Sequence, residues 1–317
     1  IIAERALSSS SLVIDIASND GYLLQYYQEK GIPVLGIEPA SNIAKIAVES
    51  NIPTLNTFFT SKEAQRLATE GKHADIVHAH NVMPHVANQR DFAEGISTIL
   101  KPNGVAIIEF AYAIDTIDGT EFDQIYHEHM CYFSLTSFAR LCVQFGLHVI
   151  RVEKIAMHGG SLRVFLSHDD SNADDTVTSL LKTEEQWGVD TPLPYASFAE
   201  RTRALKQHLL TLLRTLKHDK KRIAVYGASA KGSTLMNFCG IDNSIVDYIV
   251  DRSTVKQGRI APGTKLLIKP VDTLLTDQPD YTLLLTWNFA DEIIQQQAEY
   301  RARGGKFIVP IPLMKIV

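Results

Sequence analysis

Continuous apolar runs that end in polar loops recur along the chain, with helix-like stretches between them. In the first half such runs begin at Leu12, Val34, Ala74 and Gly104. Amphipathic stretches such as residues 41–50 and 90–100 separate them. An unbroken apolar run is typical of a parallel strand buried on both faces, so the alternation predicts a strand–helix–strand sheet. Residues 135–145 then predict a helix, and residues 147–155 and 160–168 predict two further strands.

The same pattern restarts near Arg222, which indicates a second α/β unit. An apolar run there again leads into a glycine-containing loop and a helix-like stretch, and further strands are predicted near residues 246–250, 281–286 and 306–310. Between the units, polar residues give way to leucines at helical spacing over residues 197–217. We therefore predict a first domain over residues 1–168, a helical linker over 169–221 and a C-terminal Rossmann-like domain over 222–317.

Composition excludes several classes of protein. The 317 residues carry a formal net charge of −5 with both signs interspersed, so no basic stripe suggests nucleic-acid binding. Three separated cysteines, with no CxxC pair, argue against a disulfide framework or a cysteine zinc site within this chain and favour a cytoplasmic location. No apolar run is long enough to cross a membrane, and no signal peptide is evident. The first residue is not Met, and we expect further chain upstream.

The loop after the first apolar run has the features of a nucleotide site. Gly21 permits a tight turn, and a helix begins just after it, so free backbone N–H groups favour an anionic group there. Glu38 ends the next run, where a carboxylate can bind a ribose diol. The absence of GxGxxG disfavours NAD. The predicted cofactor-binding residues are Asp15, Ser18, Asn19, Gly21, Glu38, His80 and Asn81.

A cluster of proton-transfer groups follows the fourth run, where Tyr126, His127, Glu128 and His129 are consecutive. One interpretation is a metal site formed by His127 and His129 with another histidine, but the spacing does not match the helical HExxH pattern. General acid–base chemistry is the favoured interpretation, because histidine titrates near neutral pH and a neighbouring carboxylate can orient it. We predict no metal site.

The second glycine loop, YGASAKGST, places Gly227 and Lys231 between a strand and a helix. Lys231 and helix N-terminal amides suit a pyrophosphate, and Arg252 and Asn288 follow neighbouring strands. The loop matches neither a Walker motif nor GxGxxG. It is interpreted either as part of a substrate site formed by these four residues or as a degenerate dinucleotide fold retained for packing.

These motifs together resemble the sugar C-methyltransferases that act on nucleotide-linked 4-keto-deoxysugars. The matching stretches include VIDIASNDGYLLQYYQEKGIPVLGIEPASNIA, HNVMPHV, YHEHMCYFSL, HGGSLRVF, VYGASAKGSTLMN and VDRSTVKQGRIAPGT, in order along nearly the whole chain. The resemblance implies an α/β protein with a doubly wound class I methyltransferase sheet followed by a second, smaller Rossmann-like domain. It also implies S-adenosylmethionine (SAM) as cofactor. Zinc is expected only in a four-cysteine N-terminal domain that this chain lacks.

The resemblance implies a mechanism as well. A base removes the proton beside the sugar ketone, and the resulting enolate takes the methyl group, usually at C3. The histidine that ends the YHEH motif, His129, is the implied base, with Tyr126 and Glu128 supporting it and His85 near the substrate. The expected partner is a keto-sugar linked to dTDP or GDP. Two alternatives remain open: an NAD(P)-dependent keto-sugar oxidoreductase or epimerase, and a non-catalytic nucleotide-sugar-binding fragment.

Overall fold

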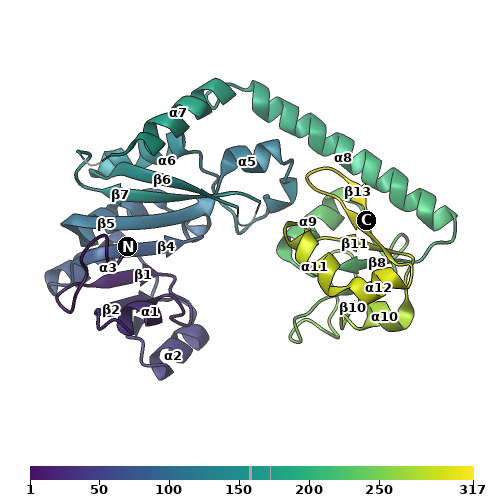
Figure 1. The fold of residues 1–317 in the computed structure, drawn as a ribbon, viewed down its shortest axis with the longest axis horizontal. Helices are drawn as coiled ribbons and strands as arrows, with labels where there is room; N and C mark the ends of the chain where they lie inside the picture. The colour runs from purple at the N-terminus through teal and green to yellow at the C-terminus, as the bar shows by residue number, and fades with distance from the viewer. Residues whose placement is uncertain (157–158, 172) are drawn as a thin grey trace. The chain divides into compact units, whose positions relative to one another are not determined.

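The computed structural model describes residues 1–156, 159–171 and 173–317, which form two compact units (Figure 1). The first unit comprises Ile1–Ile114 and Met130–Asp190, and the second comprises Asp115–His129 and Thr191–Val317. These divisions differ from the predicted limits at residues 168 and 222. The predicted linker is shared between the units, because its first helix packs on the first sheet and its leucine-bearing helix packs on the second.

The first unit is built on a mixed sheet in the order β3-β2-β1-β4-β5-β7-β6. β1 to β5 are parallel, and β7 runs antiparallel to both of its neighbours. The strands are β1 (Val13–Ile16), β2 (Val34–Ile37), β3 (Thr54–Leu55), β4 (Ala74–His80), β5 (Leu100–Ala111), β6 (His148–Ile155) and β7 (Ser161–Ser167). Strand order reverses between β1 and β4, which is where doubly wound sheets bind ligands.

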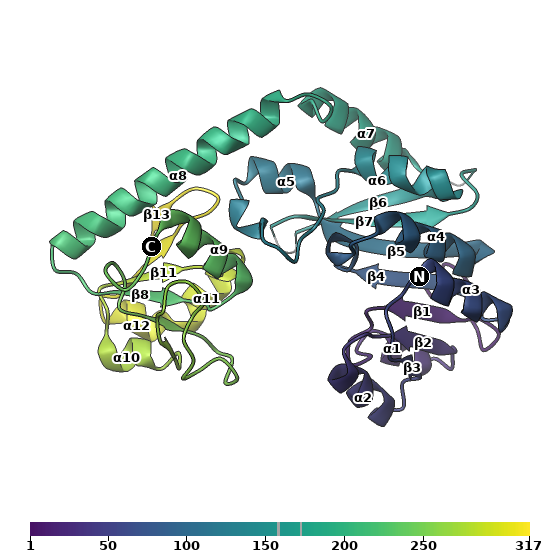
Figure 2. The same cartoon turned by 180° about the vertical axis from the view of Figure 1, so that it is seen from behind.

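Helices cover both faces of this sheet, as the apolar runs predicted. Ile14 and Ile16 belong to a core with Leu67 of α3 and Phe92 of α4, whereas Val13 belongs to a core with Leu24 of α1. Figure 2 shows α3 and α4 in front of the sheet. The helices of this unit are α1 (Leu24–Gln28), α2 (Ser41–Glu49), α3 (Ser61–Thr69), α4 (Gln89–Ile99), α6 (Leu135–Cys142) and α7 (Asp175–Trp187), with short 3₁₀ turns η1 (Met83–His85) and η3 (Val143–Phe145). The helix α5 (Ala113–Asp118) crosses into the second unit, and the 3₁₀ turn η2 (Phe122–Gln124) belongs to that unit.

A buried carboxylate fastens α7 to α6. Glu184 of α7 is fully buried and accepts hydrogen bonds from the Tyr112 hydroxyl at 2.9 Å and from the amides of Leu135 and Thr136 at 2.6 and 2.7 Å. These amides belong to the first turn of α6, where backbone N–H groups lack helical partners and favour negative charge. The contact explains why α7 belongs to the first unit.

The second unit has a sheet in the order β10-β9-β8-β11-β12-β13, parallel except for β13. Its strands are β8 (Ile223–Tyr226), β9 (Tyr248–Val250), β10 (Ile268–Lys269), β11 (Tyr281–Leu284), β12 (Lys306–Val309) and β13 (Lys315–Ile316). Its remaining helices are α8 (Leu193–His218), α9 (Ala230–Cys239), α10 (Thr273–Asp277), the 3₁₀ turn η4 (Trp287–Phe289), α11 (Ala290–Gln296) and α12 (Ala298–Ala302). Leu205, Leu209, Leu213 and Leu216 of α8 pack into its core. The predicted α/β class, with two sheets, is confirmed.

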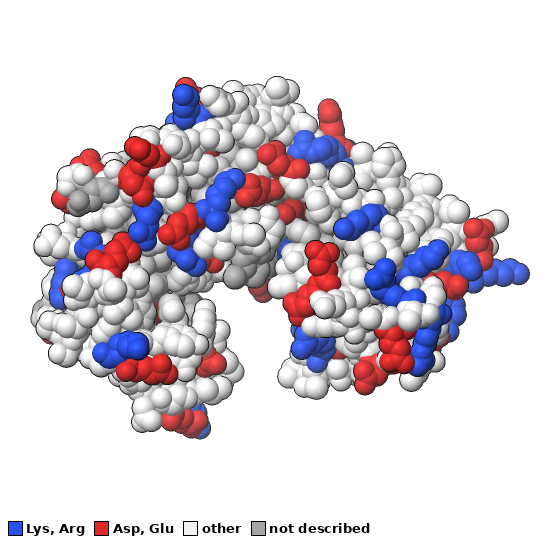
Figure 3. All heavy atoms as spheres, viewed as in Figure 1, with Lys and Arg blue, Asp and Glu red and all other residues white. Residues whose placement is uncertain are grey.

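Surface charge is mixed in sign. On the face shown in Figure 3, acidic and basic side chains alternate, with no extended area of one sign. Within the residues that the structure describes, every helix is too short or too polar to span a membrane.

Candidate active site

A cavity of about 650 Å³ opens at the carboxyl ends of β1, β2 and β4 in the first unit. Its walls come from the loop after β1, from Glu38 and Pro39 after β2, from residues 58–60 and from residues 80–82 after β4. The cavity therefore lies at the reversal of strand order, where the topology of a doubly wound sheet leaves a crevice.

The loop after β1 has a demanding backbone conformation. Ala17 and Asn19 both have a φ of 55°, and Gly21 has a φ of 84°. A Cβ atom on Gly21 would approach Ile52 to 2.9 Å, so both conformation and space require glycine there. Such left-handed residues are uncommon outside glycine and gather at ligand sites. Sequence reasoning found Gly21 but missed Ala17, because an alanine gives no local signal for this conformation.

Glu38 holds this loop and faces the cavity. Its Oε2 accepts a hydrogen bond from the Asn19 amide at 3.0 Å, and its Oε1 accepts one from the Ala40 amide at 2.7 Å. The carboxylate is therefore fixed in position between the ends of β1 and β2. Each carboxylate oxygen has further lone pairs, so Glu38 can still accept hydrogen bonds from a ribose diol.

The structure separates the predicted cofactor residues into two groups. Asn19, Glu38, His80 and Asn81 line the cavity. Asp15 and Ser18 are buried beneath it, with 4% and 0% of their surface exposed, and Gly21 lines a neighbouring shallow pocket instead. For these three residues the structure supports a role in forming the loop.

Asp15 lies on the α1 face of the sheet. Side chains alternate along β1, so Asp15 points to the same side as Val13, away from Ile14 and Ile16. Burial, together with the charge of Glu38, raises its pKa from 3.8 to about 8. Asp15 is therefore protonated at neutral pH in the structure described here.

Phe58 provides an exposed aromatic surface at the cavity. Both Phe58 and Phe59 line the cavity, but Phe58 is 74% exposed, whereas Phe59 is buried against Phe92 with ring centroids 5.3 Å apart. An exposed ring beside a carboxylate that suits a ribose is appropriate for stacking on adenine. The cavity volume, Glu38 and Phe58 together fit an adenosine-containing cofactor.

A chain of hydrogen bonds runs under this cavity. Tyr27 Oη lies 2.8 Å from His78 Nε2, His78 Nδ1 lies 3.0 Å from His80 Nε2, and His80 Nδ1 lies 3.4 Å from Glu109 Oε2. Burial lowers the pKa of His78 to about 3, so its ring is neutral. Because the Glu109 carboxylate can only accept, His80 donates to it from Nδ1. This network fixes the orientation of the His80 ring that lines the cavity.

His85, the predicted substrate-side histidine, lines the same cavity from η1. The turn that carries it is held by the Met130 amide, which donates to the Pro84 carbonyl at 2.8 Å. The structure thus brings His85 together with the cofactor residues Glu38, His80 and Asn81.

Tyr126 and His129 form a pair within the second unit. His129 Nδ1 lies 2.8 Å from the Gln124 carbonyl oxygen, and His129 Nε2 lies 2.9 Å from the Tyr126 hydroxyl. Because a carbonyl only accepts, the neutral ring carries its proton on Nδ1, and the Nε2 lone pair accepts from Tyr126. An imidazole with this tautomer can take a proton at Nε2, as a general base must. Glu128 is exposed, and its Oε1 lies 3.9 Å from Nε2 of His127, which is also exposed.

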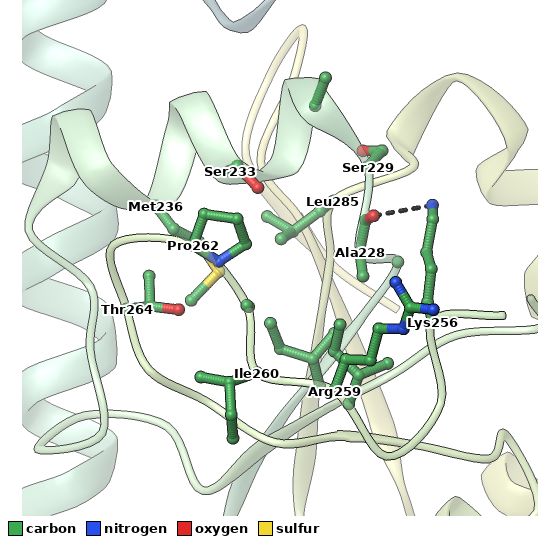
Figure 4. Close-up of a pocket in the computed structure, with 15 residues that line it drawn as sticks. Ala228, Ser229, Ser233, Met236, Lys256, Arg259, Ile260, Pro262, Thr264 and Leu285 are labelled. Atoms are coloured by element: carbon green, nitrogen blue, oxygen red, sulfur yellow. Dashed lines mark hydrogen bonds between the residues drawn. The ribbon is translucent and has the colours of Figure 1, made fainter.

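The second unit has its own cavity, of about 440 Å³, at the loop after β8 (Figure 4). Gly227, with a φ of 100°, and Ser229 form one wall, and Lys256 and Arg259 come from the loop after β9. Lys256 Nζ donates to the Ala228 carbonyl at 2.9 Å. The Thr264 hydroxyl lines the cavity, is buried, and has no hydrogen-bond partner within the described residues.

Of the four predicted substrate residues, Gly227 lines this cavity, whereas Lys231, Arg252 and Asn288 do not. Lys231 instead lies with its Nζ 4.2 Å from the centre of the Trp287 ring. Sequence analysis selected Arg252 from the VDRSTVKQGRIAPGT stretch and missed Lys256 and Arg259 in the same stretch, because residue spacing does not show which of its cations turn into the cavity.

Two further observations bear on the alternatives. Asp251, where a dinucleotide fold would present an acid to the ribose, accepts hydrogen bonds from the amides of Ala228 and Ser253 at 2.7 Å each. Its carboxylate therefore holds the protein's own loop. Across residues 1–156, 159–171 and 173–317, no three potential metal ligands gather in one place. His158 of the HGGSLR stretch lies outside the described residues.

Comparisons with known proteins agree with this geometry. Residues 2–152 match the family model of a methyltransferase domain, and residues 156–312 match that of the C-methyltransferase C-terminal domain. The C-methyltransferase NovU of Streptomyces niveus is 34% identical over 313 residues, covering 98% of this chain and 74% of NovU. A mitochondrial ubiquinone biosynthesis O-methyltransferase of Arabidopsis thaliana is 30% identical over 118 residues, covering 34% of this chain and 36% of that protein.

Among solved structures, a TehB-like SAM-dependent methyltransferase from Corynebacterium glutamicum has a TM-score of 0.38 and 14% identity, covering 52% of this chain and 84% of that one. The sequence resemblance is confirmed by the match to NovU, which extends over 98% of this chain, and by the family model of the second half. A relative that is 34% identical over 98% of this chain, and two matched domain models of which the second is the C-methyltransferase C-terminal domain, lead to one conclusion: the chain belongs to the family of SAM-dependent C-methyltransferases.

Proposed function

We propose that the protein methylates C3 of a 4-keto-deoxysugar carried on a nucleoside diphosphate, with His129 as the base. The observation that carries this proposal is the tautomer of His129, which leaves Nε2 as the proton acceptor. SAM, when bound, supplies an electrophilic methyl group that needs no acid or metal activation. The protein's own task is therefore to generate a carbon nucleophile.

A carbonyl group makes the adjacent C–H acidic enough for an imidazole to remove its proton, provided base and carbon are held in fixed geometry. The Gln124 carbonyl and the Tyr126 hydroxyl hold the His129 ring from both sides. As the ring takes up a proton at Nε2, the Nδ1–H bond to the Gln124 carbonyl strengthens and stabilises the cation. The Tyr126 hydroxyl must move off Nε2, and it is then free to donate to an enolate oxygen.

The cofactor is assigned to the cavity of the first unit. Glu38 would accept from the ribose, Phe58 would stack on adenine, and His80 and Asn81 would form the wall after β4. The nucleoside diphosphate is assigned to the second unit, where Gly227, Lys256 and Arg259 offer a glycine loop and two cations. A glycine loop with two cations beside it suits an anionic phosphate group, which supports a nucleoside diphosphate as the carrier of the sugar.

The test uses a panel of dTDP- and GDP-linked 4-keto-sugars with a methyl-labelled SAM donor, with products identified by mass spectrometry. In parallel, exchange of the proton beside the ketone is followed in D₂O with S-adenosylhomocysteine (SAH) in place of SAM. We expect His129→Asn to abolish both methylation and exchange. His127→Asn is the matched control, since His127 is an exposed histidine two positions away.

Full activity of His129→Asn would refute the base assignment. Methylation of oxygen in place of carbon, or of sugars without a nucleotide in preference to nucleotide sugars, would refute the substrate assignment.

A further inference from the structure

The segment that carries His129 belongs structurally to the second unit, although it lies within the first unit's sequence. Residues Asp115–His129 group with Thr191–Val317. Arg201 of α8 donates to the Thr120 hydroxyl at 3.1 Å and to the Ile117 carbonyl at 2.6 Å. The Phe122 ring packs in the core of the second unit, and its centroid lies 4.9 Å from the centroid of the Phe238 ring of α9.

A buried polar group forms the centre of this attachment. Asp123 has no exposed surface, and its Oδ2 accepts a hydrogen bond at 2.7 Å from the indole Nε1 of Trp287, which lies just after β11. Lys231 of α9 places its Nζ 4.2 Å from the centre of the same indole ring. An acid, an indole and an ammonium group, contributed by three separate parts of the chain, thus lie together, with the acid and the indole buried and the lysine half-buried.

Electrostatics explain why these groups stay together. Burial raises the pKa of Asp123 to about 6, and the charge of Lys231 and the indole hydrogen bond act against this rise. Burial also lowers the pKa of Lys231, while the charges of Asp123 and Glu121 oppose that change. Removing one partner would leave the others buried with fewer compensating interactions, which is costly.

The next residue along the chain connects this group to the base. Gln124 follows Asp123 in the turn η2 and is itself buried. Its carbonyl oxygen is the acceptor that fixes the proton of His129 on Nδ1. A shift of η2 would therefore move this carbonyl and weaken the contact that determines the tautomer and the direction of the His129 ring.

We propose that Asp123, Trp287 and Lys231 are positioning residues for the base, holding η2 so that the Gln124 carbonyl keeps Nε2 of His129 as proton acceptor. This inference rests on the proposed function for its catalytic consequence. It assigns to Trp287 and Lys231 a role in orienting His129, in addition to any contact with substrate.

The decisive variant is Trp287→Phe, which removes the indole N–H but keeps an aromatic ring beneath Lys231. The chain offers a matched control, since its other tryptophan, Trp187, packs against the core of the first unit. We expect Trp287→Phe to lower kcat and the rate of proton exchange by about 10- to 100-fold, the range for a small displacement of a catalytic group. SAH affinity stays the same, because the cofactor cavity is built from residues of the first unit.

A pair of substitutions at Asp123 provides the conservative comparison. An asparagine can still accept from the Trp287 indole through its amide oxygen, whereas an alanine cannot. We expect Asp123→Asn to keep most of the exchange rate and Asp123→Ala to lose it as Trp287→Phe does. The Gln124 carbonyl stabilises the protonated ring of His129. Losing this contact in Asp123→Ala or Trp287→Phe should therefore also move the acid limb of the kcat–pH profile to lower pH.

A direct readout does not depend on catalysis. In ¹⁵N-labelled full-length chain, histidine ring shifts report which nitrogen carries the proton. Wild type and Trp187→Phe should show His129 protonated on Nδ1, with Trp287→Phe and Asp123→Ala showing mixed tautomers. SAH calorimetry and thermal unfolding show whether each variant is folded.

An unchanged His129 tautomer, exchange rate and pH profile in folded Trp287→Phe would overturn the proposal and leave the group a structural one. If wild type neither exchanges nor methylates any nucleotide sugar, the proposed function fails, and the tautomer comparison still decides the positioning role.

Discussion

Replacement of Asp15 by asparagine should stabilise the protein, and the gain should depend on pH. Asparagine has the shape of a protonated aspartic acid, so it preserves the native packing on the α1 face. In the unfolded chain Asp15 ionises with its ordinary pKa of 3.8, whereas in the folded chain burial and Glu38 raise that pKa to about 8. The folded state therefore binds more protons between these values, and wild-type stability falls as pH rises through this window.

The magnitude follows from the size of the window. From pH 3.8 to pH 7 is about three pH units, and each lowers the free energy of unfolding of wild type by about 1.4 kcal/mol. At pH 7 the aspartic acid therefore destabilises wild type by about 4 kcal/mol relative to Asp15→Asn. We expect wild type and Asp15→Asn to have similar free energies of unfolding near pH 4, to diverge up to pH 8, and to keep a constant difference above it. Urea unfolding across this pH range measures both curves.

Asp20→Asn is the matched control, since Asp20 is an exposed acid in the same loop, and its effect should stay within about 0.5 kcal/mol at every pH. A difference between wild type and Asp15→Asn that is constant from pH 4 to pH 8 would refute the reasoning, because it would show that Asp15 is ionised in the folded protein.

Four further substitutions test the cofactor cavity and the attachment of α7. Glu38→Gln should weaken SAH binding by at least about tenfold in calorimetry, because the amide group cannot accept from both backbone amides and the ribose; unchanged affinity would remove Glu38 from the site. Phe58→Ala should weaken SAH binding by about tenfold without changing the melting temperature, whereas Phe59→Ala should lower stability by about 3–5 kcal/mol; the reverse pattern would contradict the assignment of Phe58 to adenine. Glu184→Gln should lower the free energy of unfolding by about 2–4 kcal/mol in urea, because its amide N–H groups cannot accept from the α6 amides, and a loss below 0.5 kcal/mol would show that solvent reaches them.

The sheets were predictable because their strands are buried on both faces. The runs beginning at Leu12 and Arg222 became β1 and β8, and the glycine after each became a turn with positive φ. The limits of the units were not predictable in the same way. Residues 115–129 belong to the second unit through contacts such as Asp123 with Trp287, which are 164 residues apart in sequence. A local pattern carries no information about such distant partners.

The candidate site was partly predictable for a similar reason. Acidic and amide residues at strand ends, such as Glu38 and Asn81, lie in the cavity as topology requires. Asp15 was expected there too, but side-chain alternation along β1 directs it to the other face. The Tyr27–His78–His80 network depends on ring orientation, which residue spacing does not specify.

The placement of Asp115–His129 means that the chain passes from one unit to the other after residues 114, 129 and 190. No single cut in the backbone can therefore release either unit with all of its own residues. A fragment ending at Asp190 would keep this segment while losing Phe238 and Trp287, so Phe122 would face solvent and Asp123 would lose its indole donor. Dissection of this enzyme into halves should consequently yield a first half that aggregates, unless residues 115–129 are replaced by a short polar bridge.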